Sequence, residues 1–106
     1  MTNSINLCKA IESVYSDRDH DSVDAFVENN TLTIRNSWKN EDDKWIEAET
    51  IIDLSTGKSN CTVSSWDIDS EPCDCDGTYD LSGSDSEIAK AIFDTESDLA
   101  YEFECC

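Results

Sequence analysis

Carboxylates are the only side chains in this sequence numerous enough to define a chemistry. The 106 residues include 25 Asp and Glu against 7 Lys and Arg, which gives a formal net charge of −18. A small domain stays soluble with a net charge of only about 2–8 in magnitude. The excess predicts a surface that repels DNA, RNA and anionic membranes, because all three are polyanions, and that attracts strongly basic partners.

Catalytic motifs are absent from the sequence. The one histidine, His20, lies between Asp19 and Asp21, where an exposed loop position is the simplest interpretation. Only 3 glycines are present, and none belongs to a phosphate-binding loop. A Cys–His nucleophile would have to combine His20 with a cysteine, and nothing in the local sequence supports that arrangement. We therefore predict a protein that is not an enzyme and that needs no cofactor.

One acidic segment has partial calcium-binding character. Its carboxylates fit positions 1, 3, 5 and 12 of an EF-hand loop and belong to Asp17, Asp19, Asp21 and Glu28. Ser22 stands where the sharp turn of that loop requires glycine. The residues after Glu28 have the pattern of a turn and a strand instead of the exiting helix. The segment is a weak candidate for a calcium site, and an acidic loop is the simpler interpretation.

The 6 cysteines match no standard metal site or disulfide framework. Cys73 and Cys75 are separated by one residue and Cys105 and Cys106 by none, whereas structural zinc sites use pairs two to four residues apart. The first residues of the chain show no secretory signal, so we expect the reducing cytoplasm of a bacterial host and free thiols. A thiolate zinc site remains an alternative.

Hydrophobic periodicity predicts a helix near each end of the chain. Ile5, Cys8 and Ile11 recur at helical spacing, and the segment 17–21 ends this first helix. The sequence of 84–87, Ser-Asp-Ser-Glu, matches a capping box that starts the last helix. Apolar residues then continue at helical spacing at Ile88, Ile92, Leu99 and Phe103.

Between the helices the pattern is that of half-buried strands. Alternation predicts strands around 23–27, 44–54 and 61–68. A further strand contains Leu32 and Ile34 and lies between turns at 29–30 and 40–43, and a third turn follows at 56–58. We expect 69–84 to form an acidic loop, in which 78–81 is the one candidate for a short edge strand. The three tryptophans, Trp38, Trp45 and Trp66, fall in the predicted strands, and Trp38 and Trp45 could pair across a turn.

These elements predict an α+β fold formed by a single domain, residues 1–106. Its sheet would be a four-stranded antiparallel meander flanked by an N-terminal and a C-terminal helix. Both helices are expected on one face, which leaves Glu47, Glu49 and Asp53 in solvent on the other. Cys8 and Cys61 are expected to act as small apolar core residues.

The charge is concentrated in the second half of the chain. Residues 1–60 contain 12 acids and 6 bases, whereas residues 61–106 contain 13 acids and one base, Lys90. On the last helix, Asp94, Asp98 and Glu102 follow one another at four-residue spacing. Like charges at that spacing destabilise a helix by roughly 0.2–0.5 kcal/mol per pair. A charge that costs folding energy indicates a surface built to meet a basic partner.

The short chain, the helix–sheet–helix order and the exposed carboxylates resemble the small acidic inhibitors of phages and plasmids that act as DNA mimics, particularly anti-CRISPR proteins. The resemblance implies steric inhibition, in which carboxylates occupy the Lys/Arg groove of a CRISPR effector or another basic nucleic-acid-binding protein. The residues expected to contact this partner are Glu47, Glu49, Asp53, Asp67, Asp69, Glu71, Asp74, Asp76, Asp94, Asp98 and Glu102.

Three alternatives remain open from the sequence. An immunity protein that neutralises a cationic nuclease toxin would use the same electrostatics on a different target. A metal-binding module would use the calcium candidate or the cysteines. Halophilic adaptation would explain the acidity as a property of a whole proteome, which the low lysine content fits and the abundant Cys and Asn do not. Salt separates these ideas, because inhibitor binding weakens in salt while a halophilic domain is stabilised.

Overall fold

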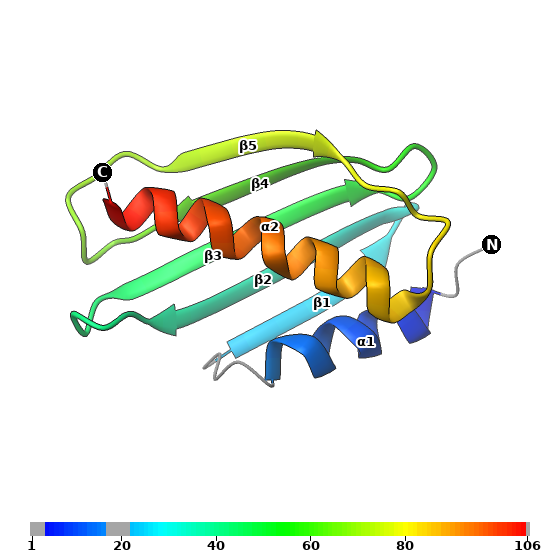
Figure 1. Ribbon diagram of the computed structural model, residues 1–106, viewed down its shortest axis with the longest axis horizontal. Helices are drawn as coiled ribbons and strands as arrows, with labels where there is room; N and C mark the ends of the chain where they lie inside the picture. Colours follow the sequence, from blue (N-terminus) through cyan, green and yellow to red (C-terminus); the bar gives the residue numbers. More distant parts are fainter. Residues whose placement is uncertain (1–3, 17–21, 106) are drawn as a thin grey trace.

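The computed structural model describes residues 4–16 and 22–105, which form two layers (Figure 1). One layer is a five-stranded antiparallel sheet with the order β1-β2-β3-β4-β5. Its strands are β1 (Ser22–Glu28), β2 (Thr31–Lys39), β3 (Trp45–Asp53), β4 (Lys58–Ser64) and β5 (Cys73–Thr78). The helices α1 (Ser4–Ser16) and α2 (Asp85–Cys105) both cover the same face of this sheet (Figure 1).

The sheet has one strand more than the sequence predicted. The α+β class, the meander order and the two flanking helices are confirmed. The prediction of four strands was wrong, because β5 lies within the segment assigned to a loop and ends where the candidate edge strand at 78–81 was expected to start. All residues of β5 except the half-buried Cys73 are exposed, so no apolar alternation marks the strand. Its formation follows from hydrogen bonding to β4, which itself ends at Ser64.

Two tight turns depend on residues that tolerate a positive φ. Asn29 and Asn30, with φ of 53° and 60°, close the β1–β2 hairpin at the predicted turn. Gly57, with φ of 81°, ends the β3–β4 turn and receives a hydrogen bond of 2.8 Å from the amide of Tyr79. A Cβ atom at position 57 would lie 2.3 Å from the Tyr79 carbonyl oxygen, so this close approach requires glycine.

The core fills the space between the sheet and the helices in two clusters. The first joins α1, β2, β3 and the start of α2 and contains Leu7, Ile11, Tyr15, Leu32, Ile34, Ile52, Ile88, Ala89, Ile92 and Phe93. The second lies under the end of α2 and contains Ile46, Ala48, Cys61, Val63, Leu99, Ala100 and Phe103. Cys61 is 2% exposed, as expected for a core residue, and Cys8 packs at the edge of the first cluster.

The start of α2 confirms Ser84 as the capping residue. The amide of Glu87 donates to Ser84 Oγ at 3.2 Å, and the Ser84 hydroxyl donates to Glu87 Oε1 at 3.0 Å. The Glu87 carboxylate therefore accepts from the serine hydroxyl instead of from the Ser84 backbone amide that a capping box would use. One of the amides that every helix start leaves without a partner is satisfied in this way.

Removing this cap is expected to cost about 1 kcal/mol of unfolding free energy. Ser84→Ala deletes the acceptor for the Glu87 amide, so its urea unfolding midpoint is expected to fall at unchanged slope. Ser86→Ala, at an exposed serine in the first turn of the same helix, is the matched control and is expected within about 0.5 kcal/mol of the parent. Equal losses in the two variants would contradict the capping role of Ser84.

Candidate functional site

The open face of the sheet carries five of the predicted contact residues: Glu47, Glu49, Asp53, Asp74 and Asp76. In an antiparallel sheet directly opposed residues point to the same face. Glu49 is opposite Thr62, and Thr62 is opposite Asp74, so carboxylates of β3 and β5 share the face that the helices leave uncovered. Glu47 and Asp53 are exposed, as predicted, whereas Glu49 is half-buried.

A basic side chain neutralises part of the negative charge on this face. Arg35 lies opposite both Asp24 and Glu49 in the register, and its Nε is 2.7 Å from Glu49 Oε2. The guanidinium also lies 5.7 Å from the centre of the Phe26 ring. A shallow depression of about 580 Å³ around Glu47 and Glu49 therefore contains an arginine among its acids. Arg35 therefore neutralises part of the negative charge over β1, β2 and β3.

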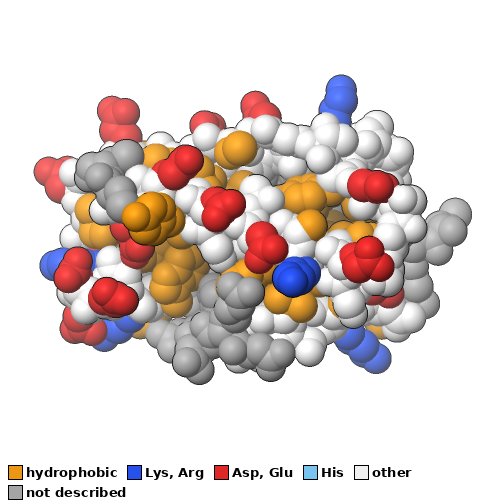
Figure 2. Space-filling model, in the orientation of Figure 1, with side chains coloured by type: hydrophobic (Ala, Val, Ile, Leu, Met, Phe, Trp, Pro, Cys, Tyr) orange, Lys and Arg blue, Asp and Glu red, His pale blue; other side chains and the backbone are white. Residues whose placement is uncertain are grey.

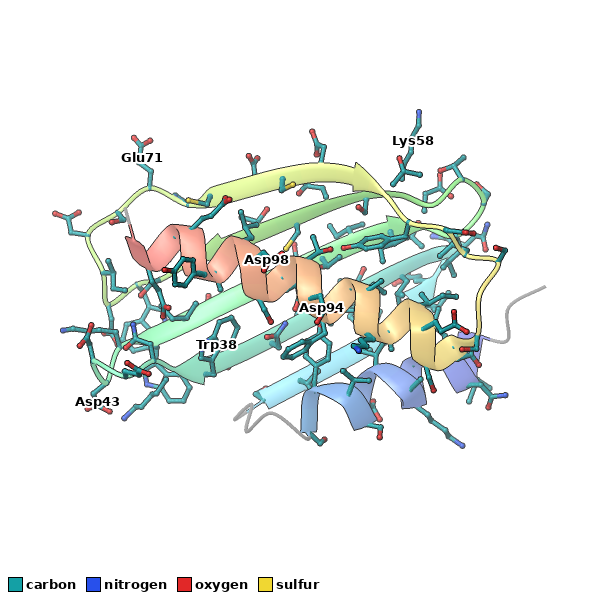
Figure 3. The ribbon with its side chains drawn as sticks, viewed as in Figure 1. Trp38, Asp43, Lys58, Glu71, Asp94 and Asp98 are labelled. Atoms are coloured by element: carbon teal, nitrogen blue, oxygen red, sulfur yellow. The ribbon has the colours of Figure 1, made fainter. Side chains whose placement is uncertain are left out.

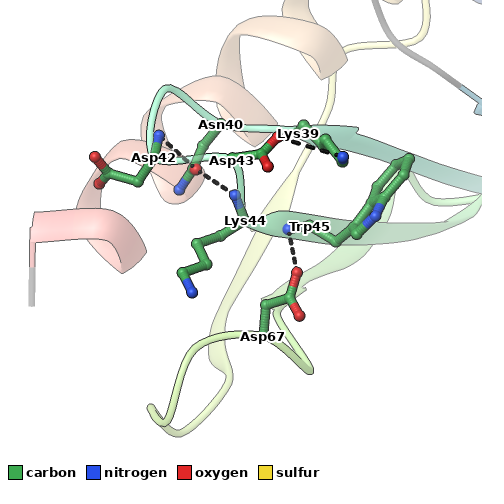
Figure 4. Close-up of polar contacts among 7 residues, drawn as sticks. All are labelled: Lys39, Asn40, Asp42, Asp43, Lys44, Trp45 and Asp67. Carbon is green, nitrogen blue, oxygen red and sulfur yellow. Dashed lines mark hydrogen bonds and ion pairs between the residues drawn. The ribbon is translucent and has the colours of Figure 1, made fainter.

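Asp67, also a predicted contact residue, has a structural role (Figure 4). Its Oδ2 accepts a hydrogen bond of 2.8 Å from the amide of Trp45, which ties the 65–72 loop to the start of β3. Asn40 organises the neighbouring β2–β3 turn, because its Oδ1 accepts from the amides of Asp42 and Lys44 at 2.9 Å each (Figure 4). The end of the sheet that carries Asp67 is thus held by hydrogen bonds between a turn and a loop.

The three tryptophans do not all lie in strands. Trp38 is opposite Ile46 and Trp45 is opposite Lys39, so the two rings point to different faces and the predicted cross-strand pair is wrong. Lys39 lies over the Trp45 ring at 5.5 Å from its centre. Trp66 belongs to the loop after β4 and is 69% exposed, which corrects its assignment to a strand.

The remaining predicted acids lie on α2 and on the loop before β5. Asp94, Asp98 and Glu102 are exposed on α2, and Figure 3 shows Asp94 and Asp98 along this helix. Asp69 and Glu71 are exposed in the loop, and Glu71 points away from the body of the protein (Figure 3). Figure 2 shows Asp and Glu side chains spread over the helix-bearing face between patches of apolar side chains.

One edge of the protein combines acids from both faces. α2 contacts β4 and β5, so the C-terminal half of α2, the 65–72 loop and β5 lie along one edge of the molecule (Figure 1). Each of these segments carries exposed acids. We call this set the anionic ridge, and it consists of Asp69, Glu71, Asp74, Asp76, Asp98 and Glu102. Lys90 is the only base after residue 60, and Lys58 lies at the opposite end of β5 from Glu71 (Figure 3).

Two exposed aspartates are stabilised in their charged form. Hydrogen bonds from the side chain and the amide of Ser55 lower the pKa of Asp53 below its ordinary value of 3.8. Ser82 lowers the pKa of Asp80 in the same way. Both carboxylates are therefore ionised throughout the neutral range and add to the negative potential.

The carboxylate that the sequence analysis missed is Glu96, which is 3% exposed. The Tyr15 hydroxyl donates to its Oε2 at 2.5 Å, Asn36 Nδ2 donates to the same oxygen at 3.0 Å, and the Thr50 hydroxyl donates to Oε1. Burial raises the pKa of Glu96, while these three donors lower it and leave a net rise. Glu96 connects α2 to α1, β2 and β3 from inside the core and cannot contact a partner.

The calcium candidate cannot be assembled from the described residues. Glu28 ends β1, while Asp17, Asp19 and Asp21 lie outside the described residues. Across residues 4–16 and 22–105, no group of three or more His, Cys, Asp or Glu side chains is placed to hold a metal ion. Cys8, Cys61, Cys73 and Cys75, the cysteines whose side chains are described, form no disulfide.

Neither of the two helices is long and apolar enough to cross a membrane, within the residues described. No protein-family model, no curated protein and no solved structure matches the chain, so the candidate site is defined by its own geometry: an anionic ridge that joins β5 to the outer side of α2.

Proposed function

We propose that this protein is a non-enzymatic inhibitor that uses its anionic surface as a nucleic-acid mimic. The partner is a basic nucleic-acid-binding protein or ribonucleoprotein, first of all a CRISPR effector in the cytoplasm of a bacterial host. Carboxylates of the anionic ridge would occupy the groove of Lys and Arg side chains that otherwise binds phosphates.

The observation that carries this proposal is the charge per unit length. The molecule measures 41 Å along its longest axis and 25 and 21 Å across. A DNA duplex of that length carries roughly 24 phosphates, at one charge per about 1.7 Å. The net charge of −18 is therefore about three quarters of the charge of DNA of equal length. A groove that attracts DNA by its phosphates would attract this protein by the same long-range force.

The spacing of the carboxylates also supports mimicry of a nucleic-acid strand. Asp74 and Asp76 are separated by two residues of β5, which corresponds to about 6.8 Å. Asp98 and Glu102 are separated by four residues of α2, a rise of about 6 Å. Both separations are on the scale of successive phosphates along one nucleic-acid strand. We favour the anionic ridge over the centre of the open face as the surface that contacts the partner, because Arg35 neutralises part of the negative charge at that centre.

The first experiment is capture of partners from a bacterial lysate at about 50 mM and about 500 mM salt. We expect a basic nucleic-acid-binding protein at low salt and its loss at high salt, since several ion contacts would be screened. Duplex DNA should compete for the captured partner. Binding that is insensitive to salt and to DNA would contradict the proposal, and capture of a cationic nuclease toxin would favour the immunity protein instead.

Charge reversal tests which surface makes the contact. The double variant Glu71→Lys/Asp98→Lys, on the ridge, is expected to weaken binding at least about tenfold at low salt. Its matched control, Glu12→Lys/Glu28→Lys, reverses two exposed acids outside the ridge, so both variants have the same net charge. Equal losses in the two variants would mean that net charge, and not the ridge, determines binding.

The single substitution Asp98→Lys should make the protein more stable while it weakens partner binding. Asp98 lies between Asp94 and Glu102 at four-residue spacing, so a lysine there converts two repulsive pairs into attractive ones. We expect Asp98→Lys alone to gain about 0.5–1 kcal/mol of unfolding free energy, measured by urea denaturation. A loss of stability would show that the acids of α2 do not repel one another.

A further inference from the structure

Three cysteines lie together where β4 meets the edge strand β5. The register sets Cys61 opposite Cys75 and Val63 opposite Cys73, so all three side chains point to the helix-bearing face. Directly opposed residues of antiparallel strands have Cα atoms about 4.5–5.5 Å apart, within the range of about 4.4–6.8 Å that a disulfide spans. Cys73 is diagonal to Cys61, at about 7–8 Å, which is outside that range.

We infer that Cys61 and Cys75 are a reversible oxidation site, at which a hydroperoxide closes a disulfide between β4 and β5. This inference is independent of the proposed function, because it rests on the strand register and on the pairing of an exposed thiol with a buried one. It also explains why two cysteines occupy facing positions in a sheet edge that is otherwise acidic and exposed.

The two thiols differ in solvent accessibility, and this difference determines which of them reacts first. Cys75 is exposed, and its thiol lies 3.7 Å from the carbonyl oxygen of Asp76. Cys61 is 2% exposed, and burial raises the pKa of its thiol to about 11. Cys75 is therefore the thiol that a peroxide reaches first, and Cys61 is the thiol that resolves the product.

The reaction balances with one hydroperoxide per disulfide. The Cys75 thiolate attacks the peroxide, so that an S–O bond forms, the O–O bond breaks and one water (or alcohol) leaves. Cys61 then attacks the sulfenic sulfur of Cys75, so that the S–S bond forms and the S–O bond breaks. The departing hydroxide takes up the Cys61 proton as a second water. Two thiols are oxidised and one peroxide is reduced.

The disulfide would link β5, the least buried strand of the sheet, covalently to β4. β5 is an edge strand of the sheet that the described residues form, and all its residues except Cys73 are exposed. A disulfide between Cys61 and Cys75 closes a loop of about 15 residues and thereby restricts the unfolded chain. We expect the melting temperature to rise by roughly 10 °C on oxidation and to return on reduction.

The test treats the fully reduced protein with stoichiometric hydrogen peroxide, alkylates the remaining thiols and maps the disulfide by mass spectrometry. Cleavage at the acidic residues between 61 and 73 separates the two halves of the bond, and cleavage at Asp74 separates Cys73 from Cys75. We expect Cys61 linked to Cys75, together with the rise in melting temperature.

Two serine variants provide the controls. Cys75→Ser changes an exposed residue and should remove both the cross-link and the temperature shift. Cys73→Ser, two residues away on the same strand and the same face, should retain both. A bond from Cys61 to Cys73, an alkylated Cys61 after peroxide treatment, or equal behaviour of the two variants would overturn the inference.

Discussion

Glu96→Ala is expected to lower the free energy of unfolding by about 2–4 kcal/mol. The substitution removes the acceptor shared by Tyr15, Asn36 and Thr50, which come from α1, β2 and β3. Each buried donor without a partner costs about 1–3 kcal/mol, and the missing side chain also leaves a cavity. Relief from burying a carboxylate offsets part of this loss, because burial disfavours the charged group.

Glu96→Gln is the matched control for that loss. Glutamine preserves the shape of the side chain, and the hydroxyls of Tyr15 and Thr50 can rotate to suit its amide. Among the described residues, the buried Oδ1 atom of Asn36 has no hydrogen-bond partner, so it can accept from the new amide after the Asn36 side chain turns over. We expect a loss below about 1 kcal/mol in urea unfolding at pH 7. Similar midpoints for the alanine and glutamine variants would show that this network does not hold the layers together.

Glu96 also shows where sequence reasoning stopped. Its position continues the apolar face of the last helix, four residues after Ile92 and three before Leu99. Helical spacing alone is compatible with a buried side chain at this position, but no inward position was predicted for Glu96, because a charged side chain is typical of the surface. Its hydrogen-bond partners lie 81, 60 and 46 residues away in the sequence. Spacing along one element cannot show that three distant donors converge on one carboxylate.

The strands also differ in how well the sequence predicts them. Glu47 and Glu49 alternate with apolar residues along β3, so their place on the open face follows from the two-residue period. β5 has no such alternation, because neither of its faces is well covered. β5 is a strand because its backbone hydrogen-bonds to the free edge of β4. The local sequence of β5 gives no indication that such an edge is available. The acids of Asp74 and Asp76 were predicted as contact residues, but their alignment on a strand was not.

The stability of the protein is expected to decrease as the pH rises above about 4.5, the ordinary pKa of glutamate. The pKa of Glu96 is raised in the folded protein, so the native state binds more protons than the unfolded chain between the two values. Stability is then greatest at the acidic end of this window and falls as the pH rises through the folded pKa. Tyr15, Cys61 and Tyr79 interact electrostatically with Glu96, and all three have raised pKa values and stay neutral in this range.

At lower pH the trend reverses, because Asp53 and Asp80 have lowered pKa values in the folded state. Their contribution is present above the ordinary value of 3.8 and is lost as the pH falls through their folded pKa values. The two effects together predict maximum stability in mildly acidic solution. Repulsion within a chain of net charge −18 acts in the same direction as Glu96, since protonation reduces it.

Comparison with Glu96→Gln separates the buried carboxylate from the general repulsion. Both proteins experience the surface charge, but only the parent has a proton to lose inside the core. Urea unfolding at a series of pH values should therefore give a steeper decline above pH 4.5 for the parent than for the glutamine variant. Parallel curves would mean that Glu96 titrates as an ordinary carboxylate, and the pH dependence would then belong to the surface alone.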